Sequence, residues 1–244
     1  MNKNIRFFEE MSLNAHVALN TMQYDGWLIR FANGHTNRAN SISVIYPSTI
    51  SFDVKVPYCE EIYKKANLPC VFKLTEDDNE LNEYLGTHGY KAVTPTDVMV
   101  MDLKDKIFQK GMCVFSKAPT EEWLRAFFAF EGFTEISVQE TFRQMLSKVL
   151  VDTIYCSVVT DDEVIACASA AMEQGYMLLQ NVIVSPEYRG HGYGQIVCES
   201  LIAQAKEKGA HHAYLQVIRK NAAAVNMYFK LGYERAYTYW YMKK

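Results

Sequence analysis

Residues 189–194 read Arg-Gly-His-Gly-Tyr-Gly, a composition that suits the binding of an anion. They follow an apolar run at 181–184, which predicts a buried strand, and precede a helical pattern that stops near Gly209. Glycines let a backbone approach a ligand closely, and the free N–H groups and dipole of a helix N-terminus attract negative charge. The order strand, glycine loop, helix therefore predicts a phosphate-binding turn.

This loop differs from the two common nucleotide fingerprints. A dinucleotide-binding turn would need a third glycine where Gln195 stands, and a P-loop would need Gly-Lys-Ser or Gly-Lys-Thr. What remains is Arg-x-x-Gly-x-Gly directly after a strand ending in Val-x-Val-x-Pro.

The elements around the loop can be predicted for residues 112–244. A strand at 113–116 is followed by a helix that Thr120 caps, and by a second helix with a Ser137-x-x-Glu140 capping box. Apolar runs predict strands at 151–159, 164–172, 176–184 and 212–217. Asn221 caps a helix that passes Tyr228 and ends at Gly232, and strand material follows at 233–242.

The first half gives a similar alternation. We expect a helix at 4–20, a hairpin around Asn33-Gly34, a helix that starts at Pro57, and a further helix after Asp78. Strands are expected at 27–31, 41–46, 71–74 and 98–101, and the charged segment 104–111 is a junction. The polar segment 36–40 is either a ligand-binding loop or a solvated hairpin arm, and its composition favours the arm.

Composition limits the classes of function. The 244 residues, 49% of them hydrophobic, suit one large or two small packed domains. A net charge of −3 argues against nucleic-acid or anionic-membrane partners. No apolar run reaches spanning length, and the N-terminus does not read as a signal peptide. The six cysteines form no Cys-x-x-Cys, so we expect no metal and a reduced, cytoplasmic protein.

Two motifs together carry a family resemblance over residues 112–244. The Arg-x-x-Gly-x-Gly loop is similar to the acetyl-CoA signature of the GCN5-related N-acetyltransferases (GNAT). The segment from Leu215 through Asn221 and Tyr228 to Gly232-Tyr233 resembles the protein-N-terminal acetyltransferases of that superfamily. The resemblance implies an α/β (α+β) GNAT fold, with a mixed central β-sheet flanked by helices.

The resemblance also implies roles for residues. Acetyl-CoA would be the co-substrate: the strand backbone would pair with the pantetheine amides, the loop amides would hold the pyrophosphate, and Asn221 would bond the CoA arm. Tyr228 would be the catalytic general acid that protonates the departing thiolate. The implied cofactor-binding residues are Val182, Ile183, Val184, Arg189, Gly190, His191, Gly192, Tyr193, Gly194, Gln195 and Asn221.

The general base does not follow from the resemblance. The similar acetyltransferases carry a glutamate on the strand before the last helix, and Gln216 stands at that place here. Glu131, Glu135 or a chain of water molecules could serve, or the amine could arrive neutral.

The chain also shows a trace of duplication. A shift of 143 residues (232 to 89) places Gly232-Tyr233 on Gly89-Tyr90 and Asn221 on Asp78. We therefore expect a tandem protein, with a degenerate GNAT-like unit at 1–105 and the acetyl-CoA-binding GNAT domain at 112–244. The first unit lacks the glycine loop, so it should bind no CoA and should help to shape the acceptor pocket.

The sequence thus predicts an N-acetyltransferase that moves acetyl from acetyl-CoA to the amine of a small molecule or peptide by direct, sequential attack. One alternative is a non-catalytic CoA-binding module, which Gln216 leaves open. Another is an acyltransferase with a different donor, such as an aminoacyl-tRNA, which the net charge disfavours. A Cys/His nucleophile has no partner at a defined spacing. The acceptor and the oligomeric state are left open.

Overall fold

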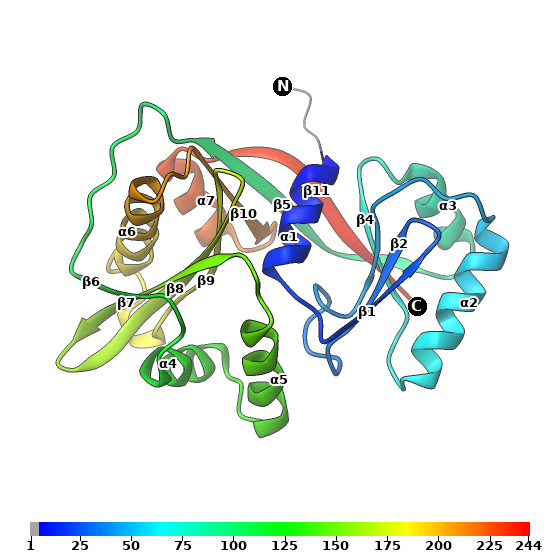
Figure 1. Ribbon diagram of the computed structural model, residues 1–244, viewed down its shortest axis with the longest axis horizontal. Helices are drawn as coiled ribbons and strands as arrows, with labels where there is room; N and C mark the ends of the chain where they lie inside the picture. Colours follow the sequence, from blue (N-terminus) through cyan, green and yellow to red (C-terminus); the bar gives the residue numbers. More distant parts are fainter. Residues whose placement is uncertain (1–4) are drawn as a thin grey trace.

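The computed structural model describes residues 5–244, and its centre is one mixed sheet of 11 strands (Figure 1). The strand order is β1-β2-β3-β4-β11-β5-β10-β9-β8-β7-β6. This architecture confirms the predicted mixed sheet flanked by helices. Among the described residues, every helix is too short or too polar to cross a lipid bilayer. The start of the helix predicted at 4–20 and of the unit predicted at 1–105 lies outside the described residues.

The elements of the first half alternate between helices and strands. They are α1 (Ile5–Ala15), β1 (Asn20–Tyr24), β2 (Trp27–Phe31), β3 (Ile42–Val44), α2 (Phe52–Lys65), β4 (Val71–Thr75), α3 (Asn79–Thr87) and β5 (Lys91–Asp102).

The second half contains the predicted strand, two helices and three strands, followed by two strand–helix pairs. Its elements are β6 (Cys113–Ser116), α4 (Glu121–Glu131), α5 (Ile136–Ser147), β7 (Asp152–Thr160), β8 (Glu163–Glu173), β9 (Tyr176–Val184), the 3-10 turn η1 (Pro186–Tyr188), α6 (Tyr193–Glu207), β10 (His212–Ile218), α7 (Ala222–Leu231) and β11 (Glu234–Lys243).

Local capping signals were right in some places and wrong in others. The Thr120 hydroxyl accepts from the Trp123 N–H at 3.1 Å, as predicted. Helix α2, however, begins at Phe52 after Ser51, and Pro57 lies inside it. A proline removes only one intrahelical hydrogen bond, and the buried Val56, Cys59 and Tyr63 hold this stretch against the sheet.

The predicted capping box is also wrong. Helix α5 starts two residues earlier than the box requires, with Glu135 instead of Ser137 at the N-cap, so Ser137 already lies in the first turn. The hydroxyl that would have capped the helix is therefore not in the N-cap position. Strand β1 was not predicted; it forms a hairpin with β2 around the Asp25-Gly26 turn.

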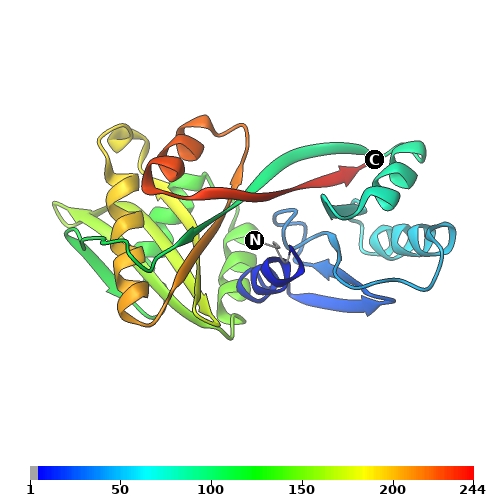
Figure 2. The ribbon, with the colours of Figure 1, turned by 90° about the horizontal axis from the view of Figure 1, so that it is seen from above.

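The last strand of each half crosses into the sheet of the other half. Strand β11 pairs antiparallel with both β4 and β5, and β5 pairs with β10. Figures 1 and 2 show β5 and β11 running from one lobe to the other. The division at 1–105 and 112–244 stays a prediction, and the strand exchange ties the two halves into one sheet.

Helices cover both faces of the sheet. In the second half, α6 and α7 pack on one face through Val197, Leu201 and Tyr228, while α4 and α5 pack on the other through Trp123 and Phe142. In the first half, α2 and α3 pack against β2, β3 and β4, with Trp27, Tyr63, Phe72 and Leu81 buried.

Helix α1 lies between the two lobes (Figures 1 and 2). Phe8 packs edge-on against Tyr176 and lies 5.3 Å, centroid to centroid, from Tyr214, both of the second half. The buried Glu9 forms an ion pair with Lys73 of β4 and accepts from the Tyr237 hydroxyl at 2.8 Å. Helix α1 therefore fixes the first-half lobe against the second-half sheet.

The structure supports the internal repeat. The shift of 143 residues (218 to 75) places the end of β10 on the end of β4, and the N-cap Asn221 of α7 on the N-cap Asp78 of α3. After each helix comes a left-handed glycine, Gly232 with φ 95° and Gly89 with φ 88°. The two halves therefore share a strand, helix and glycine in the same order, and the division into two GNAT-like units stays a prediction.

Candidate functional site

Strands β9 and β10 separate halfway along their length. They pair in parallel from His212–Tyr176 to Leu215–Leu179, and no further pair follows among the described residues. At the same level Asn181 has φ 56°, and the register of β9 against β8 shifts, so β9 bends there. A cavity of about 220 Å³ opens between the separated strands, and Val182 and Tyr228 are among the residues that line it.

The predicted glycine loop joins the end of β9 to helix α6. Gly190 and Gly192 have φ of 81° and 87°, which side chains rarely adopt, and Gly192 is the N-cap of α6. Arg189 Nε donates to the Val184 carbonyl at 3.2 Å, and a ring nitrogen of His191 lies 3.0 Å from the Arg189 carbonyl oxygen.

These contacts leave the backbone donors of the loop free. The N–H groups from Gly190 to Gly194 have no protein acceptor within residues 5–244, whereas the Gln195 N–H bonds the Gly192 carbonyl. Successive free N–H groups at a helix start form a nest for an anion. The loop therefore has the geometry that pyrophosphate binding needs, and its binding of CoA stays a prediction.

Asn221 and Tyr228 sit on helix α7, across the cavity from the end of β9. The Asn221 Oδ1 accepts from the Ala224 N–H at 3.2 Å and so caps the helix. Tyr228 follows two turns later, is 7% exposed and lines the cavity with Asn221. Burial raises the pKa of Tyr228, so the phenol stays protonated at neutral pH and can donate a proton.

Gln216 does not serve as a proton acceptor, because hydrogen bonds occupy both ends of its side-chain amide. Its Nε2 donates to Ser12 Oγ at 2.8 Å, and its Oε1 accepts from the Tyr239 hydroxyl at 3.1 Å. The residue that replaces the usual glutamate is thus a structural link between β10, β11 and α1.

The two carboxylates predicted as alternative bases lie in different places. Glu131 ends α4 and lines the cavity, whereas Glu135 stands at the N-cap of α5 and does not. Displacement of water by the surrounding protein raises the pKa of Glu131, and the positive charge of Arg38 opposes that rise. Of the residues that line the cavity, Glu131 is the one carboxylate.

Two residues of the first half, which the sequence did not single out, also line this cavity. They are His16, just after α1, and Arg38, in the polar segment 36–40. The Arg38 Nη1 lies 3.4 Å from His16 Nε2, and its Nε lies 3.4 Å from the Tyr239 hydroxyl. Burial, and then the charge of Arg38, lower the pKa of His16 well below its usual value, so the imidazole is neutral.

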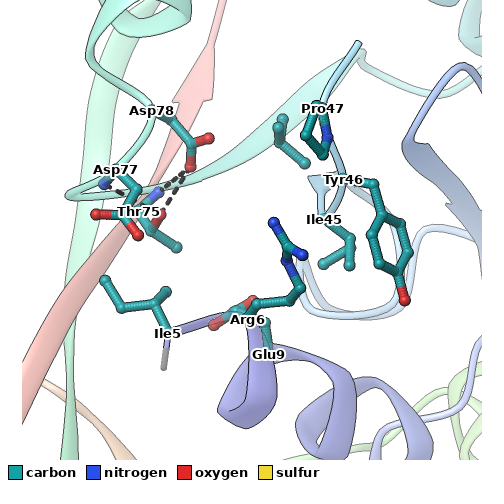
Figure 3. A pocket seen from close by; sticks show the side chains of 10 residues that line it. Ile5, Arg6, Glu9, Ile45, Tyr46, Pro47, Thr75, Asp77 and Asp78 are labelled. Carbon is teal, nitrogen blue, oxygen red and sulfur yellow. Dashed lines mark hydrogen bonds between the residues drawn. The ribbon is translucent and has the colours of Figure 1, made fainter. Parts of the chain in front are cut away.

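The first half has a cavity of about 540 Å³ at the equivalent place, but its chemistry is different. Strands β3 and β4 also pair in parallel and then separate. Figure 3 shows Asp77 and Asp78 at the end of β4, opposite Tyr46 and Pro47, with Arg6 of α1 between them. Two carboxylates beside the opening repel the phosphates of a nucleotide.

The helix start of the first half is also occupied. The carboxylate of Asp25 accepts from the N–H groups of Thr49 and Ile50 at 2.9 and 2.8 Å, just before α2. It also bonds the buried Lys55. In the loop before α2, a carboxylate of the chain itself thus occupies backbone donors, whereas the donors in the loop before α6 are free.

No group of three or more His, Cys, Asp or Glu side chains within residues 5–244 could hold a metal ion. The groups at the separated strands include the phenol of Tyr228, the carboxylate of Glu131, the guanidinium of Arg38, the imidazole of His16 and free backbone amides.

Comparison with known proteins agrees with this geometry. The family model described as "Probable histone acetyltransferase Rv0428c C-terminal" matches residues 2–242. An "Uncharacterized N-acetyltransferase YobR" of Bacillus subtilis is 25% identical over 238 residues, which cover 94% of each chain.

Solved structures share the fold. A GCN5-related N-acetyltransferase from Kribbella flavida superposes with a TM-score of 0.73 at 18% identity, over 100% of this chain and 96% of that one. A tandem GNAT protein from the clavulanic acid biosynthesis pathway gives 0.63 at 14% identity, over 84% and 74% of the two chains. The protein is an acyltransferase, and it belongs to the Rv0428c C-terminal acetyltransferase family within the GNAT superfamily.

Proposed function

We propose that this N-acetyltransferase takes its acetyl group from acetyl-CoA, bound between the separated ends of β9 and β10, and passes it directly to an amine. The observation that carries the proposal is the free row of N–H groups from Gly190 to Gly194, which follows strand β9, whose residues 178–182 line the opening together with Tyr228. Bound acetyl-CoA would supply the thioester, with its pyrophosphate at residues 190–195.

The unpaired edge of β9 fits the rest of the donor. From Gln180 onward this edge has no partner in β10, so its backbone groups are available to the two amides of a pantetheine arm. Asn221 uses Oδ1 for its cap, and its amide N–H groups have no acceptor within residues 5–244. These N–H groups lie at the start of α7, the helix that also carries Tyr228.

The chain's own residues account for both proton movements of the transfer. As the amine nitrogen bonds the acetyl carbon and the carbon–sulfur bond breaks, Tyr228 donates its phenol proton to the sulfur. Glu131 accepts the proton that the nitrogen loses, directly or through one water molecule. Proton exchange with solvent then returns Tyr228 to the phenol and removes the proton from Glu131, and no acyl-enzyme is formed.

Acetyl-CoA consumption across amines, amino acids, polyamines, amino sugars and peptides tests the proposal. We expect turnover with at least one class, and intersecting double-reciprocal lines, which a sequential mechanism gives. Parallel lines would indicate a covalent intermediate and would contradict direct transfer. Binding of acetyl-CoA without turnover of any amine would contradict the catalytic role.

A further inference from the structure

Arg38 is a partly buried cation, and Glu131 of the same cavity acts on it electrostatically without pairing with it. Among residues 5–244 it forms no ion pair with a carboxylate. Its two side-chain contacts, to Tyr239 and His16, are both 3.4 Å long and go to neutral groups. Removing a guanidinium from water without a counter-charge is costly, and its planar fork of donors matches a carboxylate.

The loop that carries Arg38 is built to hold it in place. The Asn40 Oδ1 accepts from the N–H groups of Ala32 and Gly34 at 2.7 and 3.0 Å. Its Nδ2 donates to the His35 and Thr36 carbonyls at 2.7 and 2.9 Å. The segment is therefore a fixed loop and not a solvated arm.

A second arginine fixes the base of this loop. The buried Arg30 donates to the backbone carbonyl of Arg38 at 2.8 Å and also to that of His16. One guanidinium thus holds both first-half residues that line the cavity. Such support under a single side chain is typical of a binding group, whose geometry must be set before its ligand arrives.

An anion that pairs directly with Arg38 would come with the acceptor. In the proposed complex the phosphates of acetyl-CoA lie at residues 190–195, and the pantetheine arm that enters the cavity carries no charge. Arg38 lines the same cavity as Tyr228, where the amine must meet the thioester. Glu131, the lining carboxylate, supplies the opposite charge for the amine.

We propose that Arg38 binds a carboxylate of the acceptor, so that the acceptors are small amino carboxylates, of which free amino acids are the simplest. This inference rests on the proposed function above. It assigns substrate recognition to the first half of the chain, while the donor site and the general acid belong to the second.

The wild-type protein tests the inference with matched acceptors. Alanine, phenylalanine and lysine are compared with ethylamine, phenethylamine and cadaverine, and β-alanine and γ-aminobutyrate vary the spacing between amine and carboxylate. Rates are calculated for the concentration of neutral amine. We expect kcat/KM to be about 10- to 100-fold higher for the best amino carboxylate than for the matched amine without a carboxylate, which is the effect of a hydrogen bond to a charged group. Equal values, or a preference for the plain amines, would overturn the inference.

Variants of Arg38 provide a second test of the inference. Arg38→Gln should remove the preference by raising KM for the carboxylates, and should leave the affinity for acetyl-CoA and the melting temperature close to wild type. Arg38→Lys should restore only part of the preference, because an ammonium lacks the planar fork. The control Arg125→Gln removes a charge from the exposed face of α4. It should leave both the preference for carboxylates and the KM for them unchanged.

Calorimetry separates this inference from the proposed function. The best amino carboxylate is titrated into the protein saturated with CoA, a measurement that needs no turnover. Binding that Arg38→Gln weakens at least tenfold supports the inference even if no acetyl group moves. Turnover of plain amines together with unchanged carboxylate binding in Arg38→Gln keeps the proposed function and overturns the role of Arg38.

Discussion

The side-chain amide of Gln216 donates to the hydroxyl oxygen of Ser12 at 2.8 Å, which joins strand β10 of the second half to helix α1 of the first. The same side chain accepts from Tyr239 at 3.1 Å. Gln216, at the position where the family resemblance implies a glutamate base, instead links the two halves at the edge of the cavity.

Replacement of Gln216 by alanine should therefore reduce stability. It leaves two buried hydroxyls, those of Ser12 and Tyr239, without this partner. Each lost hydrogen bond is worth about 0.5–1.5 kcal/mol net, so we expect the two together to lower the free energy of unfolding, measured with urea, by about 1–3 kcal/mol. The exposed Gln144→Ala on α5 is the control; equal unfolding curves for the two variants would show that the link carries no energy.

Tyr228→Phe tests the general acid. Loss of one general acid typically costs a factor of about 100 or more, so kcat should fall by about that much, with little change in acetyl-CoA affinity. Tyr233→Phe is a close control, because the Tyr233 ring packs against Tyr228 and its buried hydroxyl has no partner within residues 5–244. If the two variants keep the same kcat while chemistry is rate-limiting, Tyr228 is structural.

The pH dependence of kcat tests Glu131. A general base works in its deprotonated form, so kcat should fall as the pH drops through the pKa of Glu131. Because the surrounding protein raises that pKa, the fall should begin at a higher pH than an ordinary glutamate would give. Glu131→Gln should lower kcat and remove this acid limb, whereas Glu135→Gln should keep it. An acid limb that persists in Glu131→Gln belongs to another group.

Asp25 should make folding sensitive to acid. Hydrogen bonds from the Ile50 and Thr49 backbone and from Lys55 lower the pKa of Asp25 below its ordinary value. A lowered folded-state pKa contributes stability above the unfolded-state pKa, about 3.9, and that stability is lost as the pH falls below it. Asp25→Asn should therefore be less stable than wild type at pH 7, and the difference should shrink below about pH 4 in thermal melts. A difference that does not depend on pH would contradict the assignment.

The local geometry of the proposed donor side could be predicted because its signals are local. The glycine loop, the cap at Asn221 and the buried position of Tyr228 depend on residues close in sequence. The acceptor side depends on long-range contacts. His16 and Arg38 reach the cavity only because α1 docks between the lobes and β11 inserts beside β4.

The errors have a similar origin. Pro57 indicates a helix start by local rules, but tertiary packing of α2 extends the helix five residues before it, to Phe52. The polar segment 36–40 had the composition of a solvated arm. The bonds of Asn40 to the loop backbone turn it into a fixed loop, and its sequence alone does not show this.

Binding of acetyl-CoA to Gly192→Glu, measured by calorimetry, tests the central claim most directly. A Cβ at Gly192 would meet no atom within 4 Å, so a glutamate fits there, and its negative charge within the loop would repel the pyrophosphate. Gly209→Glu is the matched control, because it shares the left-handed φ and the open space but lies at the end of α6. We predict one acetyl-CoA per chain for wild type and Gly209→Glu, and no detectable binding for Gly192→Glu. Equal affinity in the two variants, or two molecules bound per wild-type chain, would contradict the account.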